Sequence, residues 1–355
     1  MLVLDDAVAL SFWSGGRKLK ILDNLRRESQ RSSLESMLET LGGGRQPGDL
    51  ARTLRRRAAT ALSSARRLGI DVIVWGDPRY PALLTPIPDA PLVLWLKGNP
   101  AALSQPSVAI VGSRAATPYG LEAASRLAGD LAAAGALIVS GLARGVDSAA
   151  HRAALRAGGE TAAVLGSGVD VVYPPEHVDL AQEITSHGVL LSELPPGTPP
   201  LAFHFPARNR IISGLSLAVV VVEAAERSGS LITASSALDQ GRAVMAVPGS
   251  ILSGRHRGCH ALIRDGAAVV ESAEDVLAEL RTSSLRPAAE VAADATLSDP
   301  ILARMTPGES YDADSLALET GLVPARLLSR LLELELRGAI RRLDGGRFVR
   351  AGRTC

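Results

Sequence analysis

The sequence predicts an α/β fold built on a doubly wound, mostly parallel sheet, with a smaller domain on each side of it. Three observations support this prediction. Apolar strand-like runs alternate with helical stretches through residues 107–280, each run is apolar throughout, and nearly all are followed by Gly, Ser, Pro or Arg. Strands without an apolar–polar alternation are typical of parallel sheets that helices cover on both faces.

Bulk composition fits a globular protein of two or three domains. The 355 residues are 46% hydrophobic and 21% charged, enough for a sizeable core. Cys259 and Cys355 lie too far apart to suggest a disulfide framework or a C-x-x-C metal site. The N-terminus carries Asp5 and Asp6 and no basic segment, and no apolar run approaches a membrane span. We therefore expect a cytoplasmic protein without membrane insertion.

Residues 1–70 are expected to form a small helical domain of sterile-alpha-motif or helix–hairpin–helix type. The helical patterns cover residues 5–12, 18–31, 33–40 and 49–68. This segment holds 13 Lys and Arg against 7 Asp and Glu, whereas residues 71–298 hold 16 against 22. A basic piece on an acidic core favours a polyanion partner, although a solvated helical face explains the same charges.

The core domain is expected over residues 71–280. Short strands at 72–75 and 92–96 enclose a proline-rich lead-in. Seven further strand-like runs follow, at residues 108–111, 136–140, 161–165, 189–191, 217–222, 243–247 and 267–270. Helical stretches lie between them, for example at residues 120–134, 148–157, 231–240 and 273–280. In such a Rossmann-like sheet, ligands bind outside the carboxyl ends of the strands, so the residues after each strand form the candidate site.

The C-terminal residues 300–355, which follow a segment of linker composition at 281–299, predict a winged-helix domain. The pattern is three short helices and a hairpin, at residues 299–305, 312–319, 324–337 and 339–350. The last helix carries Glu333 and Glu335 beside its arginines, whereas a helix that reads DNA is expected to be more basic. We therefore expect this domain to contact protein, or to contact DNA only through the wing residues Arg341, Arg342 and Arg347.

The first turn of the core, Gly112-Ser113-Arg114, follows the buried strand of the run SVAIVGSR. A tight turn before a helix that starts near Pro118 presents backbone N–H groups, and an arginine beside them can bind a phosphate bidentately. The alternative is an arginine that forms a salt bridge on the rim. Neither a G-x-G-x-x-G spacing nor a Walker A lysine occurs, so we expect no NAD, no ATP and no other cofactor.

The proline-rich segment 195–210 supplies the second candidate. It is expected to be a loop and holds two of the four phenylalanines, Phe203 and Phe205, followed by Arg208-Asn209-Arg210. An aromatic face for base stacking and cations for the backbone are what single-stranded nucleic acid requires. We expect Phe205, nearer the arginines, to stack on a base and Phe203 to pack inward. The turn Ser228-Gly229-Ser230 offers further N–H groups and hydroxyls at the same rim.

Catalytic and metal-binding patterns are weak. Asp147 and His151 lie four residues apart on one predicted helix, where a capping aspartate and a packed histidine explain them better than a catalytic dyad. No fourth metal ligand accompanies the loosely spaced group His256, Cys259 and His260. Two glutamates follow strands, and each is suited to act as a base or to pair with Arg208 or Arg210: Glu193 and Glu223. We expect no enzyme activity, no catalytic residue and no metal.

Several long motifs occur in the order in which one known family has them. They are VAIVGSRAATPYG, SGLARGVDSAAHRAAL, AVLGSGVDVVYPPEH, FPARNRIISGLS, VVEAAERSGSLITASSALDQGRAVMAVPG and GCHALIRDGA. Over residues 70–270 the chain closely resembles the DNA-processing protein A (DprA/Smf) family, and GDPRYPALL resembles the lead-in of that family.

The resemblance implies a Rossmann-like core that binds single-stranded DNA and is not an enzyme. It also implies that the protein loads a RecA-type recombinase onto incoming DNA during natural transformation, and that it forms a homodimer through the core. Carried over position by position, the implied DNA contacts are Gly112, Ser113, Arg114, Phe205, Arg208, Asn209 and Arg210, joined by Ser228, Gly229 and Ser230.

Two other functions are compatible with parts of the sequence. A nucleotide-processing phosphoribohydrolase shares the fold, but such an enzyme should keep a Gly-Gly-x-Gly-Thr turn with a catalytic glutamate shortly after it. Residues 227–233 read RSGSLIT at this place, without a glutamate. A duplex-DNA regulator would act through the winged helix and would lose DNA binding when residues 285–355 are removed.

Overall fold

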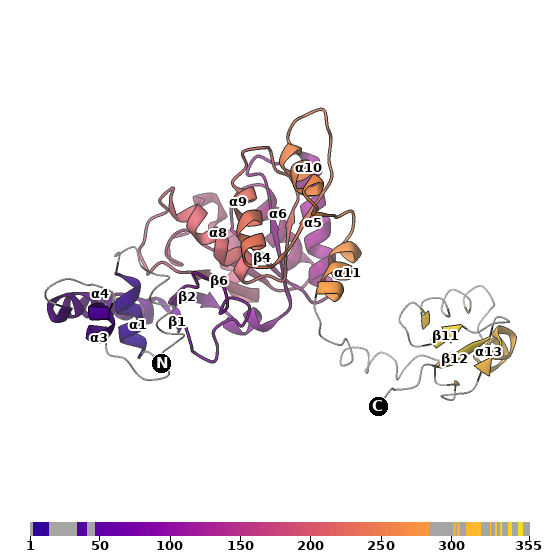
Figure 1. Cartoon of the computed structure of the whole chain (residues 1–355), viewed down its shortest axis with the longest axis horizontal. Coiled ribbons are helices and arrows are strands. Elements are labelled where there is room, and N and C mark those ends of the chain that lie inside the picture. The colour runs from indigo at the N-terminus through magenta and orange to yellow at the C-terminus, as the bar shows by residue number, and fades with distance from the viewer. Residues whose placement is uncertain are drawn as a thin grey trace. The chain divides into compact units, whose positions relative to one another are not determined.

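The chain forms two compact units, Met1–Ser283 and Ser284–Cys355 (Figure 1). A computed structural model describes residues 3–13, 34–40 and 47–283 of the first unit. In the second unit it describes residues 301, 302, 304, 305, 310–320, 327, 331, 334, 335, 340–342 and 347–350. The predicted helix over 18–31, the predicted linker beyond residue 283 and the hairpin turn at 344–346 lie outside the described residues.

Seven parallel strands form the centre of the first unit, as the unbroken apolar runs predict. They are β3 (Ser107–Val111), β4 (Leu137–Ser140), β5 (Thr161–Val164), β6 (Gly188–Ser192), β7 (Ala218–Val221), β8 (Ala243–Ala246) and β9 (Ala268–Val269). Their order in the sheet is β6-β5-β4-β3-β7-β8-β9. Beyond β6, the strand β2 (Val93–Gly98) adds antiparallel, and β1 (Asp71–Val74) adds antiparallel to β2. The chain thus runs outward from β3 to β6 and then returns to β7 beside β3.

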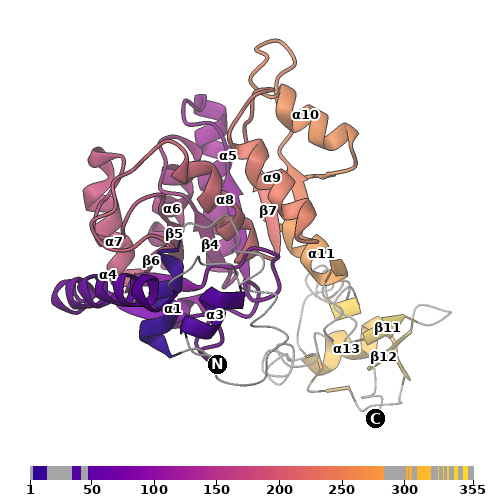
Figure 2. The same cartoon turned by 60° about the vertical axis from the view of Figure 1, so that its left-hand side comes forward.

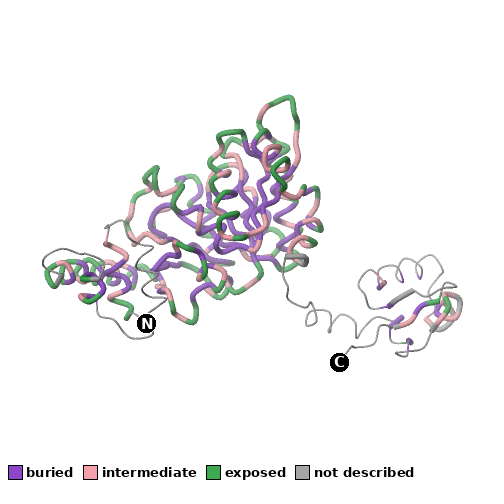
Figure 3. Tube along the Cα trace, in the orientation of Figure 1, coloured by how far each residue is buried: buried purple, intermediate pink, exposed green. Residues whose placement is uncertain are grey.

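Helices cover both faces of this sheet, which confirms the doubly wound fold. One face carries α5 (Pro118–Ala133), α6 (Val146–Arg156), α7 (Val178–His187) and α11 (Ala273–Ser283), and the other carries α8 (His204–Gly214), α9 (Ser230–Asp239) and α10 (Arg257–Arg264). Alternate residues of a strand pack against the helices of opposite faces, because successive side chains of a strand point to opposite sides of the sheet. In β3, Val108 and Ile110 pack with α5, while Ala109 and Val111 pack with the cluster that includes α8. The strands β3 to β7 are accordingly buried at every position, in the centre of the first unit (Figure 3).

The N-terminal helices share the core of the sheet. They are α1 (Leu4–Ser11), α3 (Leu34–Thr40) and α4 (Pro47–Leu68), as the patterns at 5–12, 33–40 and 49–68 predict. Val8, Leu38 and Leu54 belong to the same hydrophobic cluster as Trp95 of β2. The Arg55 guanidinium of α4 pairs with carboxylates of the two other helices, at 2.8 Å from Asp6 and 2.5 Å from Glu35.

The prediction of a loop over residues 195–210 is wrong beyond residue 203, because α8 begins at His204. Pro206 lies in the first turn of α8, where no helical hydrogen bond is lost to a proline. The helix is stabilised by burial of Ile211 and Ile212 against the sheet rather than by a clear apolar stripe. The helices α8 and α9 lie side by side (Figures 1 and 2).

The second unit is a winged helix, as predicted. Its described elements are β10 (Ser310–Tyr311), α13 (Ala313–Thr320), β11 (Ile340–Arg342) and β12 (Phe348–Arg350), and the sheet order is β10-β12-β11 with antiparallel pairing. The core of this unit includes Leu316, Leu327, Leu331 and Phe348. Within the described residues of both units, no helix is long and apolar enough to cross a bilayer.

Candidate functional site

The candidate site lies where the connections of neighbouring strands leave toward opposite faces of the sheet. The strand β3 leads into α5 on one face, and its neighbour β7 leads into α9 on the other. Ligands of open α/β sheets bind at such a switch point, outside the carboxyl ends of the strands. We call this edge the rim; it holds the turns that follow β3 to β8.

The turn Gly112-Ser113-Arg114 stands at the centre of the rim. The Ser113 N–H donates to the Glu223 carbonyl at 2.7 Å, and the Ser113 carbonyl accepts from the Val146 N–H at 3.2 Å. The exposed Arg114 has no carboxylate partner among the residues that the structure describes. Its Cζ lies 5.3 Å from the ring centroid of Phe205, a cation–π contact that leaves the guanidinium accessible to an anion.

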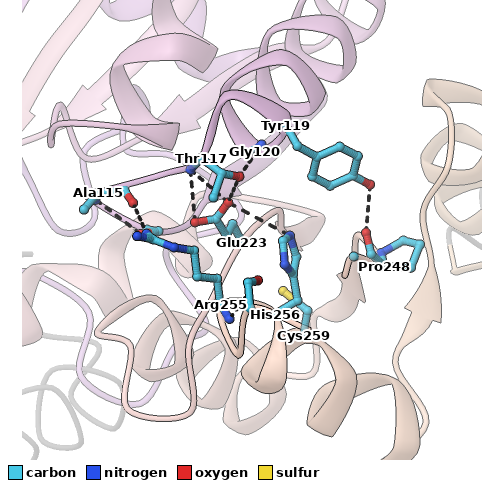
Figure 4. Close-up of polar contacts among 12 residues, drawn as sticks. Ala115, Thr117, Tyr119, Gly120, Glu223, Pro248, Arg255, His256 and Cys259 are labelled. Atoms are coloured by element: carbon cyan, nitrogen blue, oxygen red, sulfur yellow. Dashed lines mark hydrogen bonds and ion pairs between the residues drawn. The ribbon is translucent and has the colours of Figure 1, made fainter. Parts of the chain in front are cut away.

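The N-terminus of α5 is already occupied by a carboxylate of the protein (Figure 4). Glu223 is fully buried, and its oxygens accept from the Thr117 N–H at 3.1 and 3.2 Å and from the Thr117 hydroxyl. Thr117 in turn caps the helix by accepting from the Gly120 N–H at 3.1 Å. The expectation that this helix end holds a phosphate is therefore corrected: Glu223 takes the place of that anion. Glu223 also pairs with neither Arg208 nor Arg210.

A buried histidine lies behind this carboxylate (Figure 4). The His256 Nε2 is 4.0 Å from a Glu223 oxygen, and neither ring nitrogen of His256 has a hydrogen-bond partner among the described residues. Burial lowers the pKa of His256, an effect that Glu223 opposes. The ring of Tyr119 lies edge-on to His256 with centroids 5.6 Å apart, and its hydroxyl donates to the Pro248 carbonyl at 2.8 Å. This packing joins the loop after β8 to the turn after β3.

The two phenylalanines differ in burial, but not as predicted. Phe203 is 68% exposed, so the expectation that it packs inward is wrong. Phe205 is half-buried in the first turn of α8, tilted against Tyr173 with centroids 5.5 Å apart and beneath Arg114. Phe205 is therefore part of a fixed aromatic surface at the rim, whereas Phe203 is an exposed ring that lies edge-on to the neighbouring His204 with centroids 4.4 Å apart.

Arg208 points under the rim rather than toward solvent. Its guanidinium is buried and donates to the Gly141 carbonyl at 2.6 Å and to the Val164 carbonyl. Burial lowers the pKa of Arg208 to about 10, while the nearby Asp147 carboxylate raises it. These contacts commit Arg208 to the turn between β4 and α6, and they leave it no free face for a phosphate in this structure.

Asp147 and His151 hold the same turn, so the structural explanation for them is the one observed. The Asp147 carboxylate accepts from the Gly141 N–H at 3.1 Å and the Ala143 N–H at 3.3 Å, and burial raises its pKa. The His151 Nε2 lies 3.3 Å from the Leu142 N–H, and burial lowers the pKa of His151 to about 3. Leu142 has a φ of +57°, which costs about 1–3 kcal/mol for a residue other than glycine, so the turn needs these partners.

Asn209 and Arg210 also engage the protein itself. The Asn209 amide donates to the Gly229 carbonyl at 3.3 Å and so links α8 to the turn before α9. Arg210 pairs with Glu193 at 2.9 Å and with Asp89 at 2.7 Å, which confirms a pairing with Glu193. Both residues therefore brace the rim from below.

The turn Ser228-Gly229-Ser230 begins α9 at the other side of the switch point. The two serine hydroxyls lie 2.8 Å apart, and the Ser230 N–H points to the Ser228 hydroxyl at 3.4 Å. Within the part of the chain that the structure describes, no group of three or more His, Cys, Asp or Glu is placed to hold a metal ion.

Two family models match this chain. The family model described as DNA recombination-mediator protein A matches residues 71–281, and a DprA winged helix domain matches residues 286–346. The chain is 52% identical over 203 residues to the DNA processing protein DprA of Streptococcus pneumoniae, covering 57% of this chain and 72% of that protein. It is 46% identical over 220 residues to DprA of Bacillus subtilis, covering 62% and 74%.

Two solved structures are similar along their whole length. The X-ray structure of DprA from Streptococcus pneumoniae matches with a TM-score of 0.70 and 41% identity, over 79% of this chain and 99% of that one. A structure of DNA processing protein A from Helicobacter pylori, described for its single-stranded DNA binding mode, matches with a TM-score of 0.55 and 30% identity. That match covers 60% of this chain and 96% of the other.

Proposed function

Because the chain belongs to the DNA recombination-mediator protein A (DprA) family, we propose that it binds single-stranded DNA along the rim of the sheet. The observation that carries the proposal is the pair of Arg114 and Phe205. An exposed guanidinium without a carboxylate partner among the described residues lies 5.3 Å from the centroid of a fixed aromatic ring. The guanidinium can bind a phosphate, and the ring can stack on a base.

The rim residues have two different parts in this proposal. Gly112, Ser113, Arg114 and Phe205 contact the strand, with Ser228, Gly229 and Ser230 at the edge of the same surface. Arg208, Asn209 and Arg210 are positioning residues, since their polar groups hold the turns from below. Contacts of arginine and hydroxyl groups with phosphates do not read sequence, and stacking on an aromatic ring tolerates every base, so we expect binding with little base preference.

We further propose that the bound strand serves as the substrate on which a RecA-type recombinase is loaded during DNA uptake, and that two copies associate through the core. The family description as a recombination mediator supports the first part. We propose no enzyme activity. The glutamate nearest the switch point, Glu223, is buried and satisfied by Thr117, so it is not presented to a substrate as a phosphoribohydrolase would require.

The test is a fluorescence-anisotropy titration of labelled oligo-dT over a range of salt concentrations. Three proteins are compared: wild type, Arg114→Ala, and the control Arg126→Ala, which removes an exposed arginine of α5 that lies 3.9 Å from Asp130. We expect Arg114→Ala to weaken binding and to lower the slope of log K against log salt by about 0.7, the value for one lost phosphate contact on a single strand. The control should keep both values.

Duplex DNA of the same length provides the comparison of substrates. The proposal requires oligo-dT to compete more strongly than the duplex. Equal competition by duplex would overturn the proposed preference for single strands, and an unchanged slope in Arg114→Ala would show that the rim is not the binding surface.

A further inference from the structure

A pocket of about 360 Å³ lies away from the Arg114–Phe205 pair, between the N-terminal helices and the segment after β6. We call it the α4 pocket. It is lined by Phe12, Arg56, Arg57, Thr60, Ala61, Ser64, Pro195 and Pro196. The lining combines arginines, hydroxyls, an aromatic ring and prolines. The rim likewise presents an arginine, hydroxyls and an aromatic ring.

The helix α4 gives this pocket a strong positive charge. Residues 47–68 hold six arginines and one aspartate. Arg55 is neutralised by Asp6 and Glu35, but Arg56 and Arg57 are exposed and have no carboxylate partner among the described residues. The Cζ of Arg57 lies 4.6 Å from the ring centroid of Phe12, so the arginine-over-phenylalanine arrangement of the rim occurs again here.

A continuous line of contacts joins the two places. Phe205 packs on Gly166, where a Cβ atom would lie 2.9 Å from the ring. Two residues on, the Gly168 N–H donates to the Thr198 carbonyl at 3.0 Å, and a Cβ on Gly168 would lie 2.8 Å from the Pro195 carbonyl. Pro195 is itself a wall of the α4 pocket. The buried turn after β5 therefore lies between the Phe205 ring and the Pro195 wall of the α4 pocket, and it separates the two places.

We propose that the α4 pocket is a second subsite for single-stranded nucleic acid, which receives the strand after it leaves the rim. The inference rests on the proposed function of the rim and extends it. Phe12 and the two prolines form the apolar face for a base, while Arg56, Arg57 and the Ser64 hydroxyl bind phosphates. An acidic peptide would use the arginines but has no need of the aromatic face.

Because the turn after β5 separates the two sites, only a strand long enough to span both can use the α4 pocket. The test therefore titrates labelled oligo-dT in a series from about 5 to about 30 nucleotides, a range that brackets the lengths single-strand sites occupy. The variant is Arg56→Ala/Arg57→Ala in the full chain. The matched control is Arg52→Ala/Arg66→Ala, which removes two arginines of the same helix that do not line the pocket.

We expect the variant to bind the shortest oligonucleotides like wild type and the long ones about tenfold more weakly or worse. For long strands the salt slope should fall by about 1.4, for two lost phosphate contacts. Phe12→Leu, which keeps the apolar volume and all charges, should weaken binding of long strands with the slope unchanged. The control should follow wild type at every length.

The outcomes separate this inference from the function of the rim. If no oligonucleotide binds to wild type, the proposed function itself fails. If oligonucleotides bind and the variant follows wild type at every length, the α4 pocket does not contact DNA and an acidic partner is the alternative. An equal loss of affinity at all oligonucleotide lengths also overturns the inference, because the loss would then not depend on whether the strand reaches the α4 pocket.

Discussion

Arg208 offers the sharpest test of how the rim is built. The sequence places it in a basic cluster and so predicts a phosphate contact, whereas the structure turns its guanidinium toward the Gly141 and Val164 carbonyls beneath the rim. The substitution Arg208→Ala removes the donor of both hydrogen bonds and a positive charge that lowers the pKa of the buried Asp147. We expect it to weaken single-strand binding indirectly, through loss of the turn between β4 and α6.

The size of the effect follows from what the substitution leaves behind. Each buried acceptor without a donor costs about 1–3 kcal/mol, and Arg208→Ala leaves two of them, the Gly141 and Val164 carbonyls. For two such acceptors we expect the free energy of unfolding to fall by about 4 kcal/mol. At roughly 2–4 °C per kcal/mol for a domain of this size, the unfolding temperature should drop by roughly 8–16 °C.

Two measurements on Arg208→Ala and Arg114→Ala check this reasoning. Thermal unfolding should show a large loss for Arg208→Ala and almost none for the exposed Arg114→Ala. Salt titrations of oligo-dT binding should show the reverse, a lower slope for Arg114→Ala and an unchanged slope for Arg208→Ala, because a buried guanidinium releases no DNA counterion. A lowered slope with full stability in Arg208→Ala would refute the inward role and make Arg208 a direct phosphate ligand.

Three further predictions follow from the rim and its supports. Phe205→Leu should weaken oligo-dT binding by about 1–3 kcal/mol, the value of one stacked base, while Phe203→Leu, at an exposed position that lacks the arginine contact, should change it less; equal losses would contradict the assignment. The pKa of His151 is about 3 in the folded chain against about 6.5 when unfolded, so its contribution to stability is present above pH ~6.5 and is lost as the pH falls toward 3. At pH ~5.5 the free energy of unfolding should be lower by about 1.4 kcal/mol than above pH ~6.5, and His151→Gln should remove this difference. Urea unfolding of wild type and variant at pH ~5.5 and above pH ~6.5 measures the difference in each, and an identical pH dependence in the variant would contradict the reasoning. Gly120→Ala should lower the unfolding temperature, although alanine is the better helix former, because its Cβ would lie 2.5 Å from the buried Glu223 carboxylate; a stabilised variant would show that this carboxylate can move away.

Much of the fold followed from local pattern. The unbroken apolar runs of β3 to β9 predict a parallel sheet because only such strands are buried on both faces, and the hairpin signal predicts the winged helix. The helix α8 did not follow, because its sequence has no clear apolar stripe and carries a proline, Pro206, in its first turn. Its stability comes from burial against residues that are distant in the chain, which no local pattern records.

The same division holds within the candidate site. From the sequence alone, Gly112, Ser113 and Arg114 follow a predicted strand, and Phe205 precedes a pair of arginines. The carboxyl ends of the strands of a doubly wound sheet meet at one edge, so the sequence was enough to predict a site there. It did not determine which charged groups face outward. Glu223 lies 106 residues from the Thr117 that it holds, and Arg208 lies 44 residues from the Val164 carbonyl that it contacts. Only the tertiary structure decides such pairings, because a buried charge is stable only beside a partner and that partner is supplied by the packing of separate strands.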